Sequence, residues 1–120
     1  MVFSHEKLKV YQRSIEFVAW TQPVIESLPS GISSRNQLER ASTSIPLNIA
    51  EGNAKTSRKD RSRFWEIALG SSLECAAILD VLVVRDLKSP EEVREGRELL
   101  TEIVSMMMGL LKNLGAQFTE

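Results

Sequence analysis

Apolar residues recur every three or four positions along most of the chain, the spacing that places them on one face of an α-helix. Stop and start signals divide the pattern into four predicted helices, at about residues 5–28, 35–52, 58–86 and 90–114. Residues 81–84 favour a strand by composition, but they continue a helical stretch that begins at Phe64. The short connections predict an all-α, up-down-up-down antiparallel four-helix bundle.

Serine residues mark the predicted helix starts. Ser34 and Gln37 have the spacing of a capping box, in which each side chain bonds the other's backbone amide. Ser57 precedes the third helix. Ser89 precedes the fourth, where Pro90 occupies the first helical position and acidic residues follow.

Glycine and proline mark the predicted helix ends and bends. Gly52 and Gly115 end the second and fourth helices, since glycine adopts the left-handed conformation at the lowest cost. Pro23 and Pro46 lie inside the first two helices. Each is expected to kink or locally unwind its helix, because proline lacks an amide N–H and crowds the preceding turn.

The last two predicted helices distribute their apolar residues differently. The fourth has one seam with alternating steps of three and four: Val93, Gly96, Leu100, Ile103, Met107, Leu110 and Leu114. In the third, residues 75–84 contain Asp80 as their only polar residue. An outer helix of a bundle buries a single stripe, so a second apolar face needs another cover. We expect self-association, the alternative being partial cover by helix ends.

Length and composition set the class of protein. A chain of 120 residues, 42% hydrophobic and 26% charged, predicts one soluble globular domain over residues 1–120. No apolar run reaches the length of a membrane span, and no signal peptide is recognised, so a cytoplasmic protein without membrane contact is expected.

Few residues offer catalytic or metal chemistry. One cysteine and one histidine allow no internal disulfide and no Cys/His-rich zinc site within one chain. Cys75 lies in an apolar stretch and is expected to be a buried, inert thiol. No phosphate loop, nucleophile elbow or paired acid and base is found. The sequence predicts no enzyme, no catalytic residue, no metal and no cofactor.

Charge is divided between the two halves of the chain. The net charge is −1, but residues 1–63 carry a net +4 and residues 64–120 a net −5. This balance excludes a protein that coats nucleic acid with its whole surface, yet it permits a local basic patch. The candidate nucleic-acid-binding residues are Lys55, Arg58, Lys59, Arg61 and Arg63. They would attract a phosphate backbone; the alternatives are a solvated surface or a contact between subunits. Trp65 follows, either to stack on a base or to fill a core or interface.

A narrow polar stripe runs beside the apolar face of the second predicted helix. At about 100° per residue, it consists of Arg40, Ser44, Asn48 and Glu51. Glu74 of the third helix is the candidate partner, since the small residues Gly70 and Ser71 would allow close approach. We interpret these residues as a structural polar network, within the bundle or between subunits. The alternatives are a solvated face and a ligand or catalytic site.

The same segment resembles a known family. Residues 40–52 read RASTSIPLNIAEG and closely resemble the R-A-x-x-S-I-P-x-N-I-A-E-G signature of the four-helix bundle proteins encoded in 23S rRNA intervening sequences. Phe64, residues 68–71 and Glu74 match the family's F-x-x-x-A-x-G-S-x-x-E segment. Residues 8–11 are similar to its L-x-V-[WY] opening.

The resemblance implies a small bundle that assembles into a ring, commonly a homopentamer. Its relatives include the accessory variability determinant proteins of diversity-generating retroelements, which look like basic pentameric barrels that bind nucleic acid and a reverse transcriptase. We therefore expect a non-enzymatic scaffold that contacts structured RNA or a ribonucleoprotein, or another nucleic-acid-processing protein, through residues 55–63. The alternative is a structural or protein-binding homo-oligomer without a nucleic-acid role, its basic patch facing a neighbour's acidic fourth helix. An enzyme using Asn48 and Glu51 ranks third.

Overall fold

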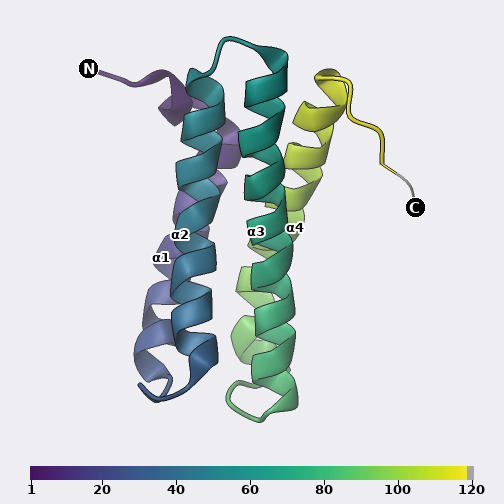
Figure 1. The fold of residues 1–120 in the computed structure, drawn as a ribbon. Helices are drawn as coiled ribbons and strands as arrows, with labels where there is room; N and C mark the ends of the chain where they lie inside the picture. The colour runs from purple at the N-terminus through teal and green to yellow at the C-terminus, as the bar shows by residue number, and fades with distance from the viewer. Residues whose placement is uncertain (119–120) are drawn as a thin grey trace.

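Four long helices make up the computed structural model, which describes residues 1–118. They are α1 (Lys9–Ser27), α2 (Ser33–Ala54), α3 (Arg58–Val84) and α4 (Pro90–Asn113), preceded by a 3-10 turn, η1 (Ser4–Lys7). The helices lie side by side and alternate in direction, joined by short loops at opposite ends (Figure 1). Residues 1–118 contain no strand, so the predicted all-α class is confirmed.

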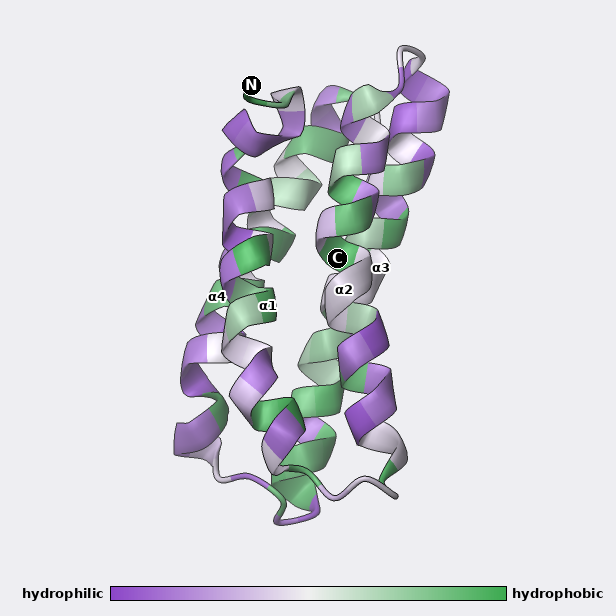
Figure 2. Cartoon of the chain, turned by 90° about the vertical axis from the view of Figure 1, so that its left-hand side faces the viewer, coloured by the Kyte–Doolittle hydropathy of each residue, from purple (hydrophilic) through white to green (hydrophobic). Residues whose placement is uncertain are grey.

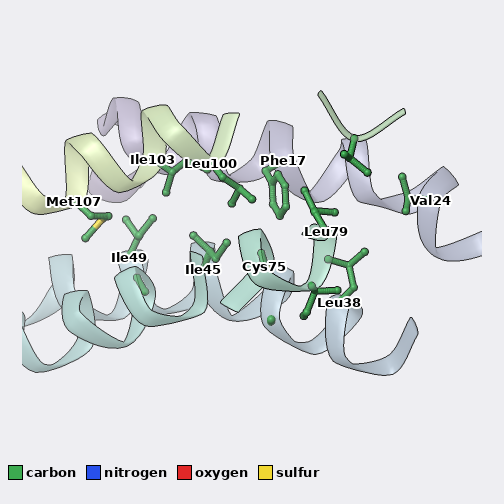
Figure 3. Close-up of a cluster of buried hydrophobic side chains, with 14 of the residues drawn as sticks. Phe17, Val24, Leu38, Ile45, Ile49, Cys75, Leu79, Leu100, Ile103 and Met107 are labelled. Atoms are coloured by element: carbon green, nitrogen blue, oxygen red, sulfur yellow. The ribbon is translucent and has the colours of Figure 1, made fainter. Parts of the chain in front are cut away.

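The helices pair in the cyclic order α1–α2–α3–α4, with α4 returning to α1. All four contribute to one apolar core (Figure 3). Ten of its buried residues are Phe17, Val24, Leu38, Ile45, Ile49, Cys75, Leu79, Leu100, Ile103 and Met107. Each of the four helices therefore buries one apolar face in this core.

The seam of α4 follows the prediction until its last turn. Val93, Leu100 and Met107 are buried as expected, but Leu111 replaces Leu110 as the next fully buried residue. The reason is geometric: 3.6 residues per turn drifts from a strict 3.5-residue repeat, so the buried face advances by four at the end. Hydrophilic residues follow the outer side of α4 (Figure 2).

Helix starts follow the prediction at α3 and α4. The Ser57 hydroxyl accepts the Asp60 amide N–H at 3.1 Å. Ser89 and Glu92 form a full capping box, with Pro90 in the first turn. The capping box predicted at Ser34 is wrong: α2 begins two residues earlier than expected, at Ser33, with Ile32 at the N-cap and no side-chain cap.

Two predicted boundaries are corrected. Gly52 does not end α2, which continues to Ala54. Its lack of a side chain serves packing instead, because a Cβ there would lie 2.4 Å from the Trp65 ring. The first helix begins at Lys9, since Leu8 has extended backbone and separates η1 from α1.

Proline and glycine act differently at the remaining positions. Helical structure continues through Pro23 and Pro46, so neither residue unwinds its helix. Gly115, with φ of 101°, follows α4 in the left-handed conformation that the sequence predicts at that boundary. Asp86, with φ of 57°, turns the chain after α3, which ends at Val84.

The second apolar face of α3 is exposed. Cys75 and Leu79 are buried, whereas Val84 is 83% exposed and Val81 is 42% exposed. We call the exposed apolar residues of this helix the outer α3 face: Ile67, Leu73, Val81 and Val84. A single chain does not cover the apolar surplus that the sequence indicates.

By length and composition alone, α3 is long and apolar enough to cross a membrane. Glu74 and Asp80 interrupt the apolar part of this helix, so it contains no uninterrupted apolar run of that length. In the bundle, 39% of its most apolar stretch is buried inside the protein.

Candidate functional site

An ion pair joins α2 to α3 on the surface of the bundle. Arg40 Nη2 lies 2.8 Å from Glu74 Oε2. The two side chains remain 67% and 41% exposed, respectively. Exposed pairs contribute about 0–1 kcal/mol to stability. This pair therefore does little to hold the bundle together, but it gives two charged groups a defined orientation at the surface.

A hydrogen-bonded chain continues along the same helix contact. The hydroxyl oxygens of Ser44 and Ser71 lie 2.8 Å apart. Asn48 Nδ2 donates to the Ser44 carbonyl at 2.9 Å and to its hydroxyl at 3.0 Å. We call these residues, together with Arg40 and Glu74, the α2–α3 polar ridge.

The structure separates Glu51 from the ridge. Glu51 Oε2 instead lies 3.6 Å from the Nζ atom of Lys55, which is four residues further along the chain. Gly70 also differs from the expectation, because no atom of a neighbouring element lies where its Cβ would be. Ser71, which the sequence indicated only as a small residue, is the α3 hydroxyl of the ridge; its place in the F-x-x-x-A-x-G-S-x-x-E segment was the available signal.

The predicted basic patch lies where α2 ends and α3 begins. Arg58 and Lys59 are exposed, and neither forms an ion pair within residues 1–118. Arg61 has a different role. It donates to the carbonyls of Gly52, Asn53 and Lys55, at 3.3, 3.2 and 2.9 Å respectively, and so supplies hydrogen-bond donors to the carbonyls at the end of α2.

Two other cations of the patch flank an aromatic ring. Lys55 Nζ lies 5.2 Å from the centroid of the Phe64 ring, and Arg63 Cζ lies 4.9 Å from it. Phe64 itself is half-buried. The sequence analysis considered Trp65, and not Phe64, as the stacking residue; the available signal for Phe64 was the run of cations that precedes it, with Arg63 immediately before the ring.

Trp65 belongs to the core. Its side chain is buried and its indole N–H donates to the Ile49 carbonyl at 3.1 Å. The guanidinium of Arg61 lies 5.5 Å from the centroid of the indole ring. Of the two alternatives for Trp65, the core is therefore correct, and the indole is not available to a base.

The chemistry around Cys75 is that of an inert thiol. The pKa of Cys75 is raised to about 12, chiefly by burial and also by the neighbouring Glu74 carboxylate, while Arg40 acts in the opposite direction. The thiolate required for nucleophilic chemistry is therefore disfavoured at neutral pH. In the part of the chain that the structure describes, no group of three or more His, Cys, Asp or Glu residues could hold a metal ion.

The four antiparallel helices and their shared core define an all-α helical-bundle protein. The chain belongs to the 23S rRNA-intervening sequence protein family, whose sequence profile matches residues 6–109. This match confirms the resemblance carried by residues 40–52. No curated protein matches the chain.

A solved structure supports the same assignment. It is a protein of unknown function from the S23 ribosomal protein family of Bacteroides thetaiotaomicron VPI-5482. The two chains share 25% sequence identity and superpose with a TM-score of 0.81, over 86% of this chain and 98% of that one. The superposition thus includes most of this chain, and the function of that protein is not assigned.

Proposed function

We propose that this protein is a non-enzymatic, cytoplasmic homo-oligomeric scaffold that contacts structured RNA or a ribonucleoprotein. The family resemblance implies a ring of five subunits. The outer α3 face supplies the contact between copies, and the exposed cations at the start of α3 supply the contact with RNA. The exposure of Val84 and Leu73 in a single chain is the observation that carries the scaffold role.

Several features support a second copy as the cover for α3. Leu73, Ala77, Val81 and Val84 follow steps of four, four and three, which is the spacing of a helix packing seam. Gly70 adds open space at one end of that seam. Apolar surface of this kind marks interaction sites on soluble proteins.

A membrane is a poorer cover for the same face. Asp80 is exposed on α3, and the Glu74 carboxylate also reaches the surface. A carboxylate placed in the hydrocarbon layer is costly unless it is paired inside protein. Between copies of a bundle, both groups can stay at the wet rim of the contact and keep the partners Arg97 and Arg40.

The state of assembly tests the scaffold role. Light scattering of the wild type should give a multiple of 13.5 kDa, and Leu73→Ser/Val84→Ser should shift the mass towards one chain. Ile15→Ser is the matched control, because Ile15 is an exposed apolar residue of α1. It should leave the mass unchanged. A wild type that stays monomeric at every concentration contradicts the proposal.

The RNA contact rests on Arg58 and Lys59, whose charges no acidic residue neutralises in the described chain. Repetition of the patch around an oligomer would raise its avidity for one RNA molecule. Each phosphate contact also makes binding weaker at higher salt, because counterions are released from the RNA.

A salt series with an RNA hairpin tests this contact. Arg58→Ala/Lys59→Ala should weaken binding and reduce the dependence of affinity on salt. Arg85→Ala/Arg94→Ala removes the same charge near the α3–α4 loop, at the other end of the bundle, and should have the smaller effect. Equal affinities for all three proteins would favour the alternative, a homo-oligomer without a nucleic-acid role.

A further inference from the structure

Phe64 occupies an unusual position in the basic patch. The cations of Lys55 and Arg63 both lie over its half-buried ring, at 5.2 and 4.9 Å from the ring centroid. A cation over an aromatic face is attracted by the ring quadrupole. The ring therefore holds two long, flexible side chains close to one point on the surface. Arg63 forms no ion pair within residues 1–118, and Lys55 forms only a partly exposed one with Glu51, at 3.6 Å.

The neighbouring residues hold this cluster on a rigid support. Trp65 is fixed in the core by its bond to the Ile49 carbonyl. Successive residues of a helix point about 100° apart, so a Trp65 that faces the core leaves Phe64 at the edge of the bundle. Arg61 Nη2 donates to the Lys55 carbonyl at 2.9 Å and thereby fixes the backbone that carries the Lys55 side chain.

We infer that Phe64 is a stacking platform for an unpaired nucleobase, and that the flexible Lys55 and Arg63 side chains move from the ring to the phosphates on either side of that base. This inference rests on the proposed RNA contact. A nucleotide combines a flat π-face with flanking negative charge, which is the combination that this cluster complements. A protein carboxylate would pair with the cations but would make no use of the ring face.

The inferred ligand is single-stranded RNA, as found in a hairpin loop or bulge. Bases inside a duplex are already stacked on their neighbours, so they do not offer a free face to a side chain. Stacking on an aromatic residue tolerates any base, because every base has a π-face. The cluster should consequently prefer unpaired RNA over duplex RNA without strong sequence preference.

A loop that contains 2-aminopurine provides the test, since the fluorescence of this base is quenched by stacking. The wild type should quench the probe and bind the hairpin loop more tightly than a duplex of equal length. Phe64→Leu should lose the quenching and about tenfold of the loop affinity, with duplex affinity unchanged. Phe64→Trp should retain both loop properties, and Phe118→Leu is the control for loss of a partly exposed aromatic residue elsewhere.

Other results distinguish failure of the stacking role of Phe64 from failure of the proposed RNA contact. If Phe64→Leu binds and quenches like the wild type while Arg58→Ala/Lys59→Ala weakens binding, the stacking role is overturned and the basic patch stands. If Phe64→Leu weakens duplex and loop binding equally, the ring serves only to position cations, and stacking is again overturned. If the wild type binds neither RNA, both proposals fall. Should Phe64→Leu not fold, absence of quenching by wild type and Phe64→Trp would still overturn the inference.

Discussion

The indole of Trp65 lies so close to Gly52 that a Cβ at position 52 would come within 2.4 Å of it. A glycine inside a helix costs about 0.5–1 kcal/mol relative to alanine. Here that cost accompanies a tight contact between α2 and α3, in which the indole N–H also reaches the Ile49 carbonyl. This contact holds the end of α2 beside the start of α3, where the proposed RNA-binding residues lie.

Gly52→Ala should destabilise the protein by about 1–3 kcal/mol, because the new methyl group overpacks against the buried ring. Thermal unfolding followed by circular dichroism measures this effect. Gly109→Ala is the matched control: Gly109 lies inside α4, and a Cβ there would have no neighbouring atom within 4 Å, so alanine should raise the melting temperature. A neutral Gly52→Ala would contradict the contact.

A second glycine–tryptophan contact should show coupling. A Cβ on Gly96 of α4 would lie 2.3 Å from the Trp20 ring of α1. Gly96→Ala should cost about 1–3 kcal/mol, and much less when Trp20→Leu is present, because the smaller side chain removes the clash. Denaturant unfolding of the two single variants and the double variant gives the coupling. Strictly additive free energies would show that the two residues do not interact.

The polar ridge predicts unequal effects of two neighbouring substitutions. Asn48→Ala should lower stability by about 1 kcal/mol, because it removes two hydrogen bonds to Ser44. Glu51→Ala should change it by less than about 0.5 kcal/mol, because Glu51 forms only an exposed ion pair with Lys55. Urea unfolding compares them. A larger effect of Glu51→Ala would place it, and not Asn48, in the network.

The capping box at α4 should make stability depend on pH in the acid range. The backbone and side-chain hydrogen bonds from Ser89 hold the pKa of Glu92 below its ordinary value of 4.5. Because the folded pKa is lowered, this contribution is present above 4.5 and is lost as the pH falls through the folded pKa. Glu92→Gln should therefore lose less stability than the wild type between pH 6 and pH 3, measured as melting temperature. Parallel curves would contradict the assignment.

Cys75 should be unreactive in the folded protein. Since burial raises its pKa to about 12, a thiol reagent at pH 8 should label it only after denaturant is added. The raised pKa also predicts that folding loses stability as the pH rises above about 9, where the unfolded thiol ionises but the folded one does not. Rapid labelling of the native protein would show that α3 opens, or that this part of the core is accessible.

The helices and the family can be predicted from the amino-acid sequence. Helical spacing, the caps at Ser57 and Ser89 and the stop at Gly115 are local signals, because each depends on residues within about one turn. The signature at residues 40–52 carried the family assignment in the same way. Local signals also predicted the apolar surplus of α3, since composition is independent of the partner that covers it.

Which residues meet is a matter of tertiary packing. Gly52 and Gly115 are both glycines near a helix end, yet Gly52 makes room for the Trp65 ring, whereas Gly115 adopts a left-handed backbone conformation. Arg61 and Arg58 likewise differ only in what surrounds them, as Arg61 is bound to the carbonyls that end α2 and Arg58 is exposed. Such differences depend on atoms that are distant along the chain, and the distance between those atoms is set by packing and not by local propensity.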